Sequence, residues 1–100
     1  MKVNVSGHHI EITEAMQAYV EDKMSKLDRH TDNVTNSRVV LTVEKGRMMA
    51  EVTIHVSNAD INASSEDDDM YTAIDQMFDK LERQVLKHKE KQIARNHGHN

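Results

Sequence analysis

The chain has 100 residues, of which 37% are hydrophobic, a formal net charge of -4, and neither cysteine nor proline. This length and apolar content fit one small globular domain with a modest core, and the absence of cysteine excludes disulfides, a thiol nucleophile and a thiolate zinc site. The sequence shows no signal peptide and no apolar run near the roughly 18 residues of a membrane span, so we expect a cytoplasmic protein with no membrane partner.

Charge is unevenly distributed along the chain. Residues 1–79 carry 7 basic and 15 acidic side chains, a balance of -8, whereas residues 80–100 carry 6 basic and 2 acidic side chains, a balance of +4. An acidic body with a basic C-terminal segment keeps a positive field at one face, and the usual partner of such a face is a polyanion.

The N-terminal third of the chain predicts a strand, a helix and a loop. Residues 2–6 alternate between polar and apolar side chains, as in a half-buried strand, and Gly7 ends the pattern. Thr13 is a favourable N-cap, and apolar residues at helical spacing predict a helix from there to about Arg29. The polar residues 30–37 then predict a loop.

Three strands are predicted to follow in quick succession. Residues 38–45 and 49–57 both alternate, and Gly46 between them predicts a hairpin turn. Residues 58–60 predict a second tight turn, and residues 61–63 a short fourth strand.

The last helix is predicted from Asp68 to Lys91. The preceding stretch SSEDDD, residues 64–69, collects residues that start helices. The predicted core stripe of this helix consists of Met70, Ile74, Met77, Phe78, Leu81 and Val85.

This order predicts an α+β fold of two layers, β-α-β-β-β-α. Each strand has one strongly apolar face and each helix one apolar stripe, so we expect a four-stranded sheet with both helices on one face and water on the other. Residues 1–92 form this single domain, and residues 93–100 are predicted to be a disordered, histidine-containing tail.

The last helix gathers its cations on one side. At about 100° per residue, four cations and an amide form a ridge beside the apolar stripe. This basic ridge consists of Lys80, Arg83, Gln84, Lys87 and Lys91. Complementation of the helix macrodipole explains the last cations of the ridge, but Lys80 and Arg83 lie well before the last turn.

The first helix adds a second basic side, formed by Tyr19, Lys23, Lys26 and His30. Helices in a two-layer fold lie side by side, so we expect the two basic sides to face a common groove and bind phosphates there. The open sheet face carries no aromatic residue, which disfavours a base-stacking platform. Folded RNA, bound by its phosphates and 2′-hydroxyls, is the expected ligand.

Metal and enzyme functions are weaker interpretations. His97 and His99 predict at most adventitious metal capture, and the acids of residues 66–69 are better explained as helix-starting residues than as a Mg²⁺ site. Ser6 near His8 is the only visible nucleophile–base pair, and alternation points Ser6 to the wet face. We therefore expect no enzyme, no cofactor and no small-molecule substrate.

Several segments resemble the bacterial ribosome hibernation factors. DMYTAIDQMFDKLERQVLKHK, residues 69–89, is similar to the last helix of that family, and EITEAM, residues 11–16, to the entry of its first helix. VVLTVEK and DINASSEDDDMY also match, so the resemblance spans residues 1–92. The family fold, β-α-β-β-β-α, is similar to a double-stranded-RNA-binding domain with an added strand.

The resemblance implies a protein that binds rRNA of the small ribosomal subunit between head and body. There it would block the channel of messenger RNA and of the A- and P-site transfer RNAs, and inhibit translation in stationary phase. The implied RNA-binding residues are Lys23, Lys26, Lys80, Arg83, Gln84, Lys87 and Lys91.

The length of the chain is similar to that of the short hibernation promoting factors, which support ribosome dimers together with the ribosome modulation factor. A second possibility is a protein Y-like factor that inactivates single ribosomes without promoting dimers. A third, from a different class, is a protein-interaction adaptor that uses a sheet edge and binds no RNA.

Overall fold

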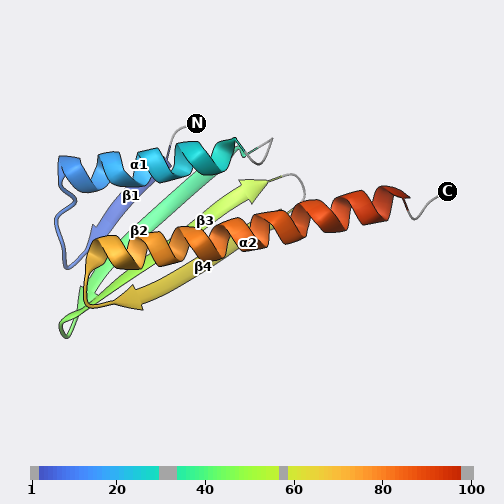
Figure 1. The fold of residues 1–100 in the computed structure, drawn as a ribbon. Helices are drawn as coiled ribbons and strands as arrows, with labels where there is room; N and C mark the ends of the chain where they lie inside the picture. Colours follow the sequence, from blue (N-terminus) through green and yellow to red (C-terminus); the bar gives the residue numbers. More distant parts are fainter. Residues whose placement is uncertain (1–2, 30–33, 57–58, 98–100) are drawn as a thin grey trace.

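The computed structural model describes residues 3–29, 34–56 and 59–97, with only the backbone path described for residues 91–97. Its elements are β1 (Val3–His8), α1 (Glu14–Asp28), β2 (Asn36–Glu44), β3 (Arg47–Val56), β4 (Ala59–Asp67) and α2 (Met70–His97). This is the predicted β-α-β-β-β-α order, and both helices cover the same face of the sheet (Figure 1). The predicted fold class is confirmed.

The sheet has the strand order β1-β2-β3-β4, with β1 parallel to β2 and the other pairs antiparallel. The register sets Val5 beside Val39, Val39 beside Val52, and Val52 beside Ala63, so one apolar row crosses all four strands. Helix α1 connects the parallel neighbours β1 and β2 and contacts β1, while α2 packs on β3 and β4.

The core lies between the sheet and the helices. Strands contribute alternate residues to it, and the stripe predicted for α2 is buried along its whole length, from Met70 to Val85. In α1 the same holds for Met16, Val20 and Met24. Periodicity alone was sufficient to find these residues, because each element buries only one side.

Two local signals acted as predicted. The Oγ1 atom of Thr13 accepts a hydrogen bond from the amide of Met16 at 3.1 Å and caps α1, whose C-cap is Arg29. Lys45 and Gly46 have φ values of 51° and 77°, the left-handed pair that a tight hairpin between β2 and β3 requires.

Strand β4 is longer than predicted. Ala59 and Asp60 belong to the strand and not to a turn, whereas residues 57–58 lie outside the described part of the chain. At the other end the ladder continues to Asp67, which pairs with Met48 of β3. Pairing with a long β3 therefore overrides the local tendency of residues 64–67 to start a helix.

Only Asp68 and Asp69 separate β4 from α2. The Asp69 carboxylate accepts a hydrogen bond from the amide of Thr72 at 2.9 Å and so caps the helix. Arg47 is hydrogen-bonded to Glu66 at 2.8 Å and to Asp68 at 2.5 Å. The acids that the sequence grouped at a helix start thus have separate roles in a strand, an ion-pair cluster and a cap.

Helix α2 continues to His97, beyond the predicted end at Lys91. It is about 42 Å long at 1.5 Å per residue, and among its residues with described side chains, 70–90, the last buried core residue is Val85. The C-terminal part therefore projects past the sheet, and the molecule measures 53 × 23 × 18 Å (Figure 1). Of the tail predicted for residues 93–100, the backbone is helical to His97, and residues 98–100 lie outside the described part.

Candidate nucleic-acid interface

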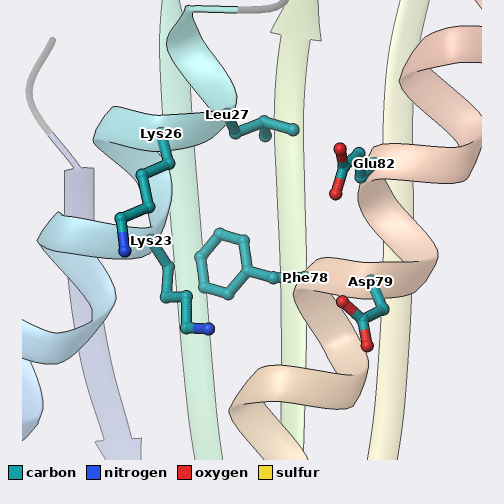
Figure 2. A pocket seen from close by; sticks show the side chains of 6 residues that line it. All are labelled: Lys23, Lys26, Leu27, Phe78, Asp79 and Glu82. Carbon is teal, nitrogen blue, oxygen red and sulfur yellow. The ribbon is translucent and has the colours of Figure 1, made fainter.

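A groove of about 150 Å³ separates the two helices (Figure 2). Its floor is apolar, formed by Leu27 of α1 and by Phe78, whose ring points from α2 toward α1. The α1 wall carries Lys23 and Lys26. The α2 wall carries carboxylates, Asp79 and Glu82.

The prediction that basic sides of both helices face a common groove is therefore wrong, because only the α1 wall is basic. The side of α2 that faces α1 is an acidic stripe, Asp75, Asp79 and Glu82, spaced i, i+4 and i+7 along one flank. The i, i+4 and i+7 spacing of these three acids is visible in the sequence and is the signal that indicates an acidic flank.

Two residues of the basic ridge, Lys80 and Gln84, contact β4 instead of facing α1. Lys80 Nζ donates to the carbonyl of Ser64 at 3.0 Å, and Gln84 Nε2 donates to the carbonyl of Asn62 at 2.6 Å. Both of these predicted RNA-binding residues are thus on the side of α2 away from α1, each with a partner in the sheet.

Three side chains hold the N-terminal part of α2 to α1. Asp75 accepts a hydrogen bond from Tyr19 Oη at 2.5 Å and forms an ion pair with Lys23 Nζ at 3.0 Å. We call Tyr19, Lys23 and Asp75 the Asp75 clasp. Tyr71 packs edge-on against Tyr19 with ring centroids 4.9 Å apart, and Lys23 Nζ lies 5.5 Å from the centroid of the Tyr19 ring.

The clasp shifts the ionisation of its members. The hydrogen bond from Tyr19, and then the contacts with Lys23, hold the pKa of the Asp75 carboxyl below its ordinary value. The hydrogen bond to Asp75 is also the largest cause that raises the pKa of Tyr19 and of Lys23. All three groups favour the state in which Asp75 is charged and both donors keep their protons.

The other predicted RNA-binding cations differ in exposure and in their bonds to neighbouring side chains. Lys26 forms an i, i+4 ion pair with Asp22 at 3.2 Å, but its side chain is 63% exposed. Arg83 and Lys87 are exposed on α2, and neither side chain has a hydrogen bond or ion pair with any described residue. The residues predicted at 30 and 91 lie outside the part of the chain whose side chains are described.

The other candidate sites are not assembled. Among the described residues, no group of three His, Asp or Glu side chains is placed to hold a metal ion. The His97 side chain and His99 lie outside that part. Ser6 is exposed on β1, as alternation indicated, and β1 continues past the predicted end at Gly7 to His8, which is also exposed. No helix within the described ranges is long and apolar enough to cross a membrane.

The fold defines a small two-layer α+β domain, a four-stranded sheet covered on one face by two helices. The family model described as sigma 54 modulation protein / S30EA ribosomal protein matches residues 3–93, and the chain belongs to that family. This family of ribosome hibernation factors consists of non-enzymatic binding proteins.

Relatives match over nearly their whole length. The ribosome hibernation promoting factor of Azotobacter vinelandii is 52% identical over 98 residues, which cover 98% of this chain and 92% of the relative. The protein of the same name from Escherichia coli strain K12 is 45% identical over 91 residues, 91% of this chain and 96% of the relative.

Two solved structures have the same fold. A ribosomal subunit interface protein from Coxiella burnetii superposes with a TM-score of 0.85 at 27% identity, covering 90% of this chain and 99% of the other. The N-terminal domain of Thermus thermophilus Protein Y superposes with a TM-score of 0.82 at 35% identity, covering 88% of this chain and 99% of that domain.

Proposed function

We propose that this chain is a ribosome hibernation factor that binds rRNA of the small ribosomal subunit. The observation that carries this proposal is its 52% identity, over 98% of the chain, to a protein named ribosome hibernation promoting factor. In the proposed mechanism the protein lies between head and body of the subunit, in the channel of messenger RNA and of the A- and P-site transfer RNAs. Translation is inhibited by occupation of that channel, and a ribosome-bound protein is cytoplasmic.

The surface supports phosphate binding at two separate places. Arg83 and Lys87 on α2 have no hydrogen bond or ion pair with another described residue, and Lys26 on α1 is well exposed despite its ion pair with Asp22. We propose these three, together with Lys91, as direct RNA contacts. Lys23 and Lys26 line the α1 wall of the groove, and Asp79 and Glu82 line its α2 wall, so the groove itself has no excess of positive charge and we expect the phosphates at the exposed ends of the cations.

The other proposed RNA-binding residues are engaged within the fold. Lys23 pairs with Asp75, and Lys80 and Gln84 reach carbonyls of β4. Each of these side chains would have to exchange an internal bond for one to RNA, which lowers its net contribution to affinity. Within the described part of the chain Arg83 and Lys87 have no such bond to exchange, and they are therefore the residues to test first.

Sedimentation with purified small subunits tests the proposal. We compare Arg83→Gln/Lys87→Gln with Arg38→Gln/Lys45→Gln, a control that loses the same charge from exposed cations on β2 and on its hairpin turn. The α2 variant is expected to leave the subunit fraction of a sucrose gradient, while the control stays bound. Equal retention of both variants would contradict the proposed contacts.

Salt dependence separates RNA binding from the adaptor function. Each lost phosphate contact flattens the plot of log K against log[salt] by about 1, so the α2 variant should have a slope shallower by about 2. An adaptor that uses a sheet edge and touches no RNA would bind its partner with a slope near zero for every variant.

We also propose that the chain promotes ribosome dimers in stationary phase, acting with the ribosome modulation factor. The similarity to the Protein Y domain favours a second candidate, a factor that inactivates single ribosomes. Gradients of ribosomes with the chain, with and without the modulation factor, distinguish the two. Dimers that appear only with both proteins support the first, and ribosomes that stay single in either case support the second.

A further inference from the structure

The two edges of the sheet are unequally protected. Strand β1 is an edge of only 6 residues, and it ends in a tight turn in which a Cβ atom on Gly7 would lie 2.2 Å from the carbonyl oxygen of Ile10. Strand β4, the other edge, has 9 residues. Long edge strands present unpaired amides and carbonyls that can pair with another chain.

Helix α2 covers this edge with side chains in register. Lys80 and Gln84 are one turn apart, about 6 Å along the helix, and they bond to the carbonyls of Ser64 and Asn62. These carbonyls are two residues apart, about 6.8 Å along the strand, and therefore point to the same side of β4. A third bond, between the side chains of Ser65 and Gln76 (Oγ to Oε1, 2.7 Å), joins the same strand to the preceding turn of the helix.

We propose that the β4 edge is a latent interaction surface for β4 of a second copy of this chain, kept closed by Lys80 and Gln84. Antiparallel pairing of two β4 strands about Ala63 sets Asn62 of one copy opposite Ser64 of the other. If Asn62 of one copy and Ser64 of the other form a hydrogen-bonded pair, the carbonyl of each residue accepts a bond from the amide of the other. These are the two atoms that Lys80 and Gln84 occupy, so the helix and a second copy compete for the same acceptors.

Charge supplies a second restraint on this pairing. The same register places Asp60 of one copy opposite Glu66 of the other, and like charges directly opposite each other are destabilising. Salt screens this repulsion. Pairing through β4 should therefore strengthen with salt, whereas binding to RNA phosphates weakens.

The experiment replaces the two sealing side chains and keeps their apolar length. Lys80→Met/Gln84→Met is compared by sedimentation equilibrium with Lys87→Met, a control that loses the same charge from the same helix. The variant is expected to rise in weight-average mass with concentration, from 11.5 kDa toward twice that value, and more steeply at high salt. The control and the unmodified chain are expected to remain at one chain's mass.

Amide hydrogen exchange locates the new contact. In the self-associated variant the outward amides of Asn62 and Ser64 should become protected at high protein concentration and lose that protection on dilution. A variant that remains folded and stays at the mass of one chain at every concentration and salt would overturn the proposal. So would association without protection of these amides. Neither outcome depends on ribosome binding, so the proposed function stands or falls separately.

Discussion

Asp75→Asn tests the Asp75 clasp, because it removes the charge that Tyr19 and Lys23 share and keeps the size of the side chain. The Lys23 and Asp75 side chains are 31% and 45% exposed, so solvent screens the ion pair, and such pairs contribute about 0.2–1 kcal/mol. The hydrogen bond from Tyr19 adds about 1 kcal/mol. We expect a loss of about 1–2 kcal/mol, and Tm falls by roughly 4–8 °C per kcal/mol in a domain of this size.

The effect should depend on pH with a defined sign. The Asp75 pKa is lowered by the Tyr19 hydrogen bond and by Lys23, so its contribution is complete above the ordinary aspartate value, about 3.9, and is lost as pH falls through the folded pKa. The pKa of Tyr19 and that of Lys23 are raised by the bond to Asp75. Their contribution is complete below about pH 10 and is lost at higher pH.

Urea unfolding followed by far-UV circular dichroism provides the measurement. At neutral pH, Asp75→Asn should have a free energy of unfolding lower than that of the unmodified chain by the full loss of about 1–2 kcal/mol. At pH values well below the ordinary aspartate pKa the difference between the two should be small. Tyr19→Phe, which removes only the hydroxyl, and the double variant complete a cycle that should show coupling between the two side chains. A deficit of Asp75→Asn that is the same at acidic and neutral pH, or additive effects of the two changes, would refute this account of the clasp.

Two further predictions concern local structure. Thr13→Ala removes the cap of α1 and should lower the free energy of unfolding by about 1 kcal/mol, while Ser25→Ala on the exposed side of the same helix should leave the urea midpoint nearly unchanged. Gly7→Ala should cost about 1–3 kcal/mol, because the added Cβ meets the backbone of Ile10 at 2.2 Å. Gly46→Ala is its control: the space around it is open, and only the backbone cost of φ +77°, about 1–2 kcal/mol, remains.

The sequence predicted the layers of this fold well because each local signal concerned one element. Alternation identified the buried residues of β2 and β3, and Thr13 and Gly46 marked a helix start and a hairpin. The extent of β4 was not predictable in this way. Its last residues, Ser64 to Asp67, favour helix starts locally, and only the ladder to Met48 holds them in a strand. The strand with which a segment pairs is determined by the whole sheet and cannot be read from the sequence of that segment alone.

The sequence did not predict which flank of α2 faces α1, for a related reason. A helical projection gives the angle between Lys80 and the apolar stripe, but not which neighbour lies beyond each flank. That requires the strand order β1-β2-β3-β4, with α1 on the β1 side and α2 over β3 and β4. Once this order is known, one flank of α2 must face α1 and the other must face the β4 edge. The same projection then assigns Asp79 to the groove and Gln84 to the sheet.

The acidic stripe limits how folded RNA can meet the two helices. A phosphate in the groove would meet the carboxylates of Asp79 and Glu82 as well as the ammonium groups of Lys23 and Lys26, so the groove lining has no excess of positive charge, and its apolar floor supplies no donor. On the outer side of α2, Arg83 and Lys87 are exposed and have no bond to another residue that the structure describes, and the backbone of the helix continues past the sheet to His97. In the proposed interaction Arg83 and Lys87 contact RNA from the outer side of α2, and Lys26 contacts it from the α1 wall of the groove.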